Sequence, residues 1–234
     1  MHIKLYHSLI SLAILTTIGG CKSYDVTSRY TSRYITSNTG KLAVVTPEAY
    51  ELGLSILALT EFAGRDTSLI NSNTDYYREF KAYFDKYKSH KAVVQLNAGL
   101  TSAKMVEQFR NGLFAFKLID GRFALNENYR IDNSKIQFKR YAILFEDFYR
   151  DSNFEGFYSA HQSTYGQIRQ KTEGLVSFDN LKSTLNKDAN SFHIVVSPLM
   201  KGFAGTMDIK GMNFNECVVF PYLTSSSLVY KQAK

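Results

Sequence analysis

Apolar residues recur at helical spacing through the first two thirds of the chain and predict a series of amphipathic helices. The first begins after Thr46-Pro47, since threonine can cap a helix and proline suits its first turn, and Gly64 ends it. The other predicted helices cover residues 74–88, 101–110, 133–150, 154–171 and 178–186.

Alternating and β-branched runs predict short strands between and after these helices. Residues 113–119 and 122–125 flank Asp120-Gly121, a two-residue turn typical of a β-hairpin. Further extended segments are predicted at 33–36 paired with 42–45, at 91–96, at 192–197 and at 217–220, with a long glycine-marked loop between the last two. The pattern therefore predicts an α+β fold, mostly helical with short antiparallel strands and one hairpin.

The N-terminus has the order of an export signal. The apolar run at residues 9–18 is too short to cross a bilayer core of about 30 Å. Gly19 and Gly20 then precede Cys21, and this order resembles the lipobox of bacterial lipoproteins. The resemblance implies cleavage before Cys21 and lipid on its thiol, which anchors the protein to a membrane without spanning it. The alternative is an ordinary secretory signal followed by a chance cysteine.

These features divide the chain into a signal peptide at 1–20, a lipidated tether at 21–40 and a single α+β domain at 41–234. The tether is rich in Ser, Thr, Tyr and Arg. Lys22, where a retention signal would have Asp, resembles the enterobacterial pattern for delivery to the outer membrane. The expected location is thus the cell envelope, with the membrane as a partner through lipid on Cys21.

Composition narrows the partners. Cleavage leaves 214 of the 234 residues and removes only Lys4 among the charged side chains, so the net charge changes from +7 to +6. That charge suits anionic headgroups or glycans. The basic residues are scattered and an exported protein seldom meets nucleic acid, so no nucleic-acid binding is predicted. Cys217 is left without a disulfide partner and, inside an apolar run, is interpreted as a buried structural thiol.

The sequence contains no P-loop, GxSxG, CxxC or HExxH motif. Four groups of residues have a chemical interpretation and a structural alternative. An aromatic stripe can either stack sugars or form core, and three acids can either hold a hard cation or lie exposed at a helix end. His90 can either act as a metal ligand or base, or cap a helix. His161 can either activate Ser159 as a nucleophile or have no catalytic role. His193 is predicted to be a half-buried strand residue. The stripe is Tyr76, Phe80, Tyr83 and Tyr87, and the acids are Asp147, Asp151 and Glu155.

Several segments together resemble a known family. They are Thr46-Pro47-Glu48-Ala49-Tyr50-Glu51-Leu52, Ile56-Leu57-Ala58-Leu59-Thr60-Glu61, Tyr76-Tyr77, Tyr83-Phe84, His90-Lys91-Ala92-Val93 and the run from Phe192 to Met200. Their order is similar to that in a family of Bacteroidota lipoproteins of unknown function whose members look like HExxH zinc peptidases. The resemblance implies the N-terminal part of a zinc-peptidase-like domain. It also implies that a strand beside the cleft binds extended substrate through backbone bonds, and this strand would be Phe192, His193, Ile194, Val195, Val196 and Ser197.

The family carries its zinc motif on a helix further downstream, and that motif is absent from this sequence. Zinc is therefore implied only by the resemblance, and no catalytic or metal-ligating residue can be assigned. The favoured function is a membrane-anchored envelope lipoprotein, a non-catalytic or C-terminally truncated member of that family. The alternatives are an envelope binding module for peptide or glycan and an active hydrolase with an unrecognised site. The truncated-member hypothesis predicts an exposed apolar surface where the missing helix would pack. The binding-module hypothesis predicts that the segment after Pro221 closes the core.

Overall fold

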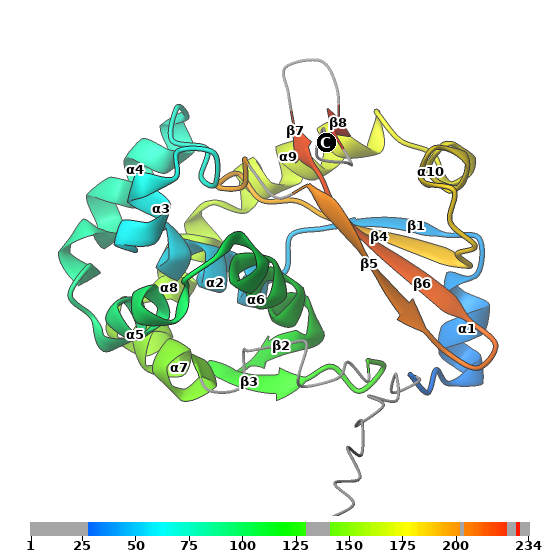
Figure 1. Ribbon diagram of the computed structural model, residues 1–234, viewed down its shortest axis with the longest axis horizontal. Coiled ribbons are helices and arrows are strands. Elements are labelled where there is room, and N and C mark those ends of the chain that lie inside the picture. The colour runs from blue at the N-terminus through cyan, green and yellow to red at the C-terminus, as the bar shows by residue number, and fades with distance from the viewer. Residues whose placement is uncertain (1–27, 130–140, 202–203, 224–227, 230–234) are drawn as a thin grey trace, which may run out of the picture.

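The computed structural model describes residues 28–129, 141–201, 204–223 and 228–229. Its central element is a sheet of four strands in the order β1-β4-β6-β5 (Figure 1). β4 pairs in parallel with both β1 and β6, and β5 runs antiparallel to β6. The strands are β1 Leu42–Val45, β4 Ser191–Val195, β5 Gly205–Lys210 and β6 Asn215–Phe220. The predicted α+β class is confirmed, but the sheet contains parallel pairs as well as the expected antiparallel ones.

Helices supply the apolar cover for both faces of this sheet. Side chains of α10 and Ile168 of α9 pack on one face, and side chains of a larger helical layer containing α2, α4, α5, α6, α7 and α8 pack on the other. The helices are α1 Ser32–Asn38, α2 Glu48–Ala58, α3 Glu61–Arg65, α4 Asp75–Phe84, the 3-10 turn η1 Asp85–Tyr87, α5 Lys91–Gly99, α6 Ala103–Ala115, α7 Ala142–Asp151, α8 Phe154–Ala160, α9 Gln162–Glu173 and α10 Phe178–Leu185.

Strand alternation decides which side chains face the helical layer. Phe192 and Ile194 of β4 belong to the core beneath α10, whereas Val195 belongs to the core of the helical layer. Successive strand residues point to opposite faces, so His193 shares the face of Val195. In β6 the same rule puts Glu216 on the face of Val218, whose side chain also lies in the helical-layer core. Two polar residues are thereby brought to the same side of the sheet.

The aromatic stripe of α4 forms core. Tyr76 is 6% exposed and Phe80 is fully buried. The hydroxyl groups of Tyr83 and Tyr87 donate to the backbone carbonyls of Asn153 and Asp151, at 3.2 and 3.0 Å. The structural alternative is therefore confirmed, and the sugar-stacking hypothesis for this stripe is not supported by the geometry.

The segment before β1 folds differently from the prediction. Residues 32–38 form α1, because Thr31 caps it by accepting from the backbone N–H of Tyr34. The predicted strand at 33–36 is wrong, and β1 pairs with β4 instead. Residues 28–40 are also part of the domain and not a tether, since Ser28 bridges Gly211 and Tyr30 packs on Phe214. The remainder of the predicted tether lies outside the described residues.

Two predicted extended or irregular segments are also wrong. Residues 91–99 form α5, which His90 caps and which buries Ala92 and Leu96 at helical spacing. Residues 205–210 form β5, although a long loop was expected there, because β6 pairs with them over its whole length. The histidine cap of α5 and the pairing of β5 with β6 cannot be recognised from local hydrophobic periodicity.

Several boundaries also shift. Pro47 takes the cap position of α2 without a side-chain bond, and the predicted helix to Gly64 is divided between α2 and α3. α6 continues through Gly112 to Ala115, and the helical stretch from Phe154 breaks at His161 instead of near Gly166. The predicted start of α7 at residues 133–134 lies outside the described residues.

The hairpin and the cap of α10 are confirmed. β2 Phe116–Ile119 pairs antiparallel with β3 Arg122–Leu125, and both Asp120 and Gly121 have positive φ, as a type I′ turn requires. Ser177 accepts from the N–H of Asn180 at the start of α10. After β6, Tyr222–Leu223 and Leu228–Val229 form a small pair, β7 and β8.

Candidate functional site

A buried carboxylate organises the polar side chains on the sheet face toward the helical layer. Glu216 is 1% exposed and directly precedes the apolar residues 217–220 of β6. Its carboxylate accepts hydrogen bonds from the hydroxyl groups of Tyr34 and Tyr129, each at 2.7 Å, and from Ser191 at 3.1 Å. The Nδ1 atom of His193 lies 3.2 Å from the same carboxylate. Four side chains from α1, β4 and the segment after β3 therefore converge on Glu216.

These contacts keep Glu216 ionised. Burial acts to raise the pKa of the carboxyl group, but the hydrogen bond and charge of His193, with the hydroxyl groups of Tyr129 and Tyr34, leave it below the ordinary value. Because its partners hold Glu216 as an anion, Nδ1 of His193 has a fixed hydrogen-bond acceptor. The arrangement locks the orientation of the imidazole ring.

His193 also lines a pocket of about 540 Å³. The pocket lies between the start of α2, the hairpin, α9 and β4, and its size is in the range of about 300–1,000 Å³ found for small-molecule sites. Its lining residues are Val44, Val45, Thr46, Pro47, Glu48, Ala49, Phe114, Phe116, Lys117, Leu118, Asn126, Tyr129, Arg169 and His193. We call this cavity the His193 pocket.

The pocket has apolar walls and charged groups around them. Phe114 lies with its ring centroid 6.0 Å from that of His193. Lys117 forms an ion pair with Glu127 at 2.6 Å. Glu48 accepts from the hydroxyl of Tyr149 at 3.2 Å, and burial raises the pKa of this carboxyl group. The pocket thus combines apolar surface with donors and acceptors on several elements, as ligand sites do.

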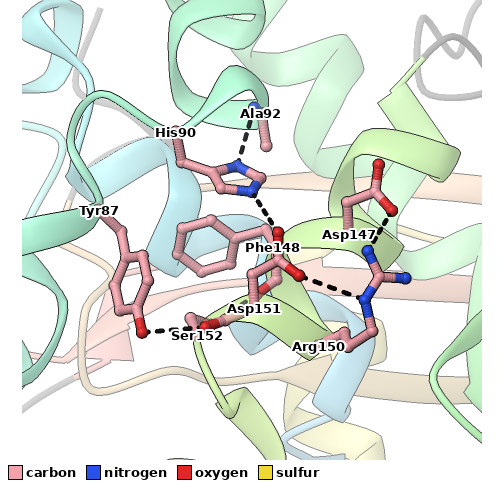
Figure 2. Close-up of polar contacts among 8 residues, drawn as sticks. All are labelled: Tyr87, His90, Ala92, Asp147, Phe148, Arg150, Asp151 and Ser152. Atoms are coloured by element: carbon pink, nitrogen blue, oxygen red, sulfur yellow. Dashed lines mark hydrogen bonds and ion pairs between the residues drawn. The ribbon is translucent and has the colours of Figure 1, made fainter.

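His90 takes a structural role in a second polar cluster. Figure 2 shows its imidazole between the N-terminus of α5 and the end of α7. Nδ1 accepts from the backbone N–H of Ala92 at 3.1 Å, and Nε2 lies 3.3 Å from Oδ2 of Asp151. With both ring nitrogens engaged, this histidine joins two helices, which confirms the capping alternative over a base or metal ligand.

The acidic residues near His90 pair with a cation of the chain itself. Arg150 contacts Asp147 at 2.7 Å and Asp151 at 3.2 Å (Figure 2). Glu155 belongs to α8 and so is not on the same helix as the two aspartates. Within the described part of the chain, no group of three or more His, Cys, Asp or Glu side chains could hold a metal ion. The side chains of Asp147 and Asp151 are 42% and 47% exposed and Glu155 is exposed, which supports the exposed-acid alternative.

The other sequence candidates have structural roles. The ring nitrogens of His161 contact the carbonyl of Phe157 at 2.8 Å and Glu79 at 2.9 Å, while Ser159 is exposed, so the two do not form a serine–histidine pair. Cys217 is 1% exposed, and burial raises its pKa to about 12, which confirms a structural thiol. Cys21 lies outside the described residues.

The substrate-strand hypothesis for Phe192 to Ser197 requires a correction. β4 is an interior strand of the sheet, hydrogen-bonded to β1 on one side and to β6 on the other. Its backbone groups are therefore already hydrogen-bonded to these neighbours, and an extended substrate cannot pair with it. The functional interest of this segment lies in one side chain, His193, which was predicted to be half-buried and is so.

Sequence reasoning missed the partners of His193. Tyr34, Tyr129 and Glu216 are distant from it in the chain and share no motif spacing. One signal was available, because Glu216 is a carboxylate directly before the apolar run 217–220, and a charge in a buried strand is expected to have partners.

Comparisons with protein-family models, curated proteins and solved structures find no match to this chain. Among the residues that the structure describes, no helix is long and apolar enough to cross a membrane.

Proposed function

We propose that the protein is a lipid-anchored lipoprotein of the cell envelope that binds a peptide or glycan ligand in the His193 pocket. The observation that carries the proposal is the fixed imidazole of His193 at a cavity of about 540 Å³. A binding site needs polar groups whose orientation is set before the ligand arrives, and the buried carboxylate of Glu216 provides this for His193.

The location rests on the N-terminal sequence. The order Gly19-Gly20-Cys21 after a short apolar run supports lipid attachment, and Lys22 supports delivery to the outer membrane. The resemblance to Bacteroidota zinc-peptidase-like lipoproteins supports the proposal that the protein is a non-catalytic member of that family. Zinc plays no part in the binding function proposed here.

The surface favours a binding module over a decayed enzyme domain. Loss of a packing helix would leave an element with a continuous apolar face, whereas the large exposed hydrophobic side chains of the described residues come singly from α5, α7, each strand of the hairpin and two loops. They are Val94, Ile119, Leu125, Ile143, Leu175 and Met212.

Hydrolysis is the second candidate, because a histidine bonded to a buried carboxylate is the arrangement of a general base. The neighbouring hydroxyl, that of Tyr129, lies 3.3 Å from Nδ1 of His193, but burial raises its pKa far above the ordinary value and makes it a poor nucleophile. Turnover of ester substrates by the wild type that is lost in His193→Gln would favour hydrolysis over binding.

A pair of adjacent substitutions tests the binding function. Leu118 lines the pocket, whereas its neighbour Ile119 is 47% exposed and points to the other side of the strand. We expect Leu118→Trp to fill the cavity and abolish binding of peptides and glycans released from the organism's own envelope, measured by native mass spectrometry. Ile119→Trp is the control and should bind as the wild type does. Equal binding by both variants would refute the pocket as the site.

The anchor has its own test. Cys21→Ser should abolish incorporation of radioactive palmitate and release the protein from the membrane fraction. Continued labelling of the variant would refute lipid attachment at this residue and leave the pocket proposal unaffected.

A further inference from the structure

The charges of the His193 pocket are unevenly compensated. Lys117 is neutralised by Glu127 at 2.6 Å. Glu48 accepts a hydrogen bond from Tyr149. Arg169 lines the same cavity from α9 and has no ion pair among the described residues. Of the Lys and Arg side chains that line the pocket, Arg169 is therefore the one left without an ion-pair partner in the described part of the chain.

His193 supplies a second polar group on the β4 side. Its Nδ1 atom is held by Glu216 and Tyr129, so Nε2 is the ring nitrogen that has no hydrogen-bond partner within the described residues. The His193 side chain is 16% exposed and lines the cavity. With Nδ1–H directed at the carboxylate of Glu216, an N–H at Nε2 exists only in the imidazolium form, and the carboxylate contact proposed below uses that form. Arginine and imidazolium donors are suited to carboxylate oxygens.

The remaining walls of the His193 pocket are apolar, so a ligand that places a carboxylate near Arg169 would place an apolar group against them. Phe114 and Phe116 come from the end of α6 and the start of β2, and Val45 comes from β1 on the face of the sheet that His193 shares. Phe114 and Phe116 are at most 9% exposed, so their rings form a firm surface rather than flexible cover. Aromatic and aliphatic walls of this kind stabilise an apolar side chain by removing it from water.

We propose that the ligand is a peptide whose C-terminal carboxylate is bound by Arg169 and His193 and whose last apolar side chain packs against Phe114 and Phe116. The inference rests on the binding function proposed above and specifies its ligand. A neutral glycan would leave the guanidinium of Arg169 without an anionic partner, and the structure therefore favours the peptide.

Isothermal titration calorimetry on the full chain in a neutral detergent tests this with a matched pair of probes. N-acetyl-L-phenylalanine carries the carboxylate, and N-acetyl-L-phenylalaninamide differs from it only there. We expect the acid to bind about tenfold more tightly than the amide, or better. Arg169→Gln should remove most of this preference, whereas Lys171→Gln, an exposed charge on the same helix outside the pocket, should keep it.

The outcomes separate the two proposals. Equal affinity for acid and amide, or an unchanged preference in Arg169→Gln, would overturn carboxylate recognition while leaving the pocket as a binding site. Absence of binding by either probe would also overturn it, and the binding function would then stand or fall on the Leu118→Trp experiment. Preferential binding of glucuronate over both peptide probes would show that the ligand is an acidic sugar and refute the peptide.

Discussion

Glu51 should make the stability of the fold decrease as the pH rises, and Glu51→Gln should remove this dependence. The side chain is fully buried on α2, and its Oε1 atom has no hydrogen-bond partner among the described residues. Tyr76 donates to the other oxygen at 3.4 Å. Burial raises the pKa of Glu51 to about 8, against the opposing hydrogen bonds of Ser197 and Tyr76. An ionised carboxylate is thus poorly accommodated at this position.

The sign follows from the two pKa values. Below about pH 4.5 the carboxyl group of Glu51 is protonated in the folded and unfolded states, so its own contribution to stability is most favourable there. Between that pH and about 8 the unfolded chain releases the proton first, so the free energy of unfolding decreases, and it levels off above pH 8. At about 1.4 kcal/mol per pKa unit, the loss is roughly 3 kcal/mol by pH 7 and about 5 kcal/mol in full.

Urea unfolding followed by circular dichroism, repeated from about pH 5 to pH 8, measures the effect. Glutamine keeps the size and the acceptor for Tyr76 but cannot ionise. The advantage of Glu51→Gln over the wild type should grow by about 3 kcal/mol across this interval. Glu173→Gln, an exposed acid at the end of α9, is the control and should show no comparable change. A constant difference between Glu51→Gln and wild type would refute the buried, proton-bound carboxyl group.

Three further predictions concern the core and the candidate site. Tyr34→Phe removes one donor to the buried carboxylate of Glu216 and should lower the free energy of unfolding by about 1–3 kcal/mol in urea titrations; no loss would mean that α1 is not docked on the sheet. Gly53→Ala would place Cβ 2.4 Å from a buried leucine of α6 and should lower the thermal midpoint, with a cost of about 1–3 kcal/mol, whereas Gly64→Ala meets nothing within 4 Å and should not. Cys217 should resist a thiol reagent in the native protein and react after unfolding in urea, and rapid native labelling would contradict its burial.

The elements predicted well are those whose signals are local. The turn chemistry of Asp120-Gly121 specifies a hairpin because both positions require positive φ. The hydroxyl of Ser177 specifies a helix start, and the spacing of Tyr76, Phe80 and their neighbours specifies a helix with one buried face. Each of these decisions involves residues within a few positions of one another.

The elements predicted wrongly depend on distant partners. β5 has only a short alternation, with Met207 and Ile209 between polar neighbours, in a segment marked by glycines, and it becomes a strand by pairing with β6. The run 192–197 was recognised as a strand, but its interior place in the sheet depends on β1, about 150 positions earlier in the chain. α5 begins where His90 caps it, and a histidine cap is not among the usual signals for a helix start.

By itself, the sequence determined the hairpin, most helices and the α+β class, because these follow from local periodicity and turn chemistry. The export and lipidation signals, which rest on motif order, stay predictions. Only the tertiary structure decided the candidate site. His193 became interesting when folding brought it to Glu216, a carboxylate that also accepts from Tyr129 and from Tyr34, the latter 182 positions from Glu216 in the chain. The physical reason is that a buried carboxylate must find its donors wherever the fold supplies them, and local sequence does not record where that is.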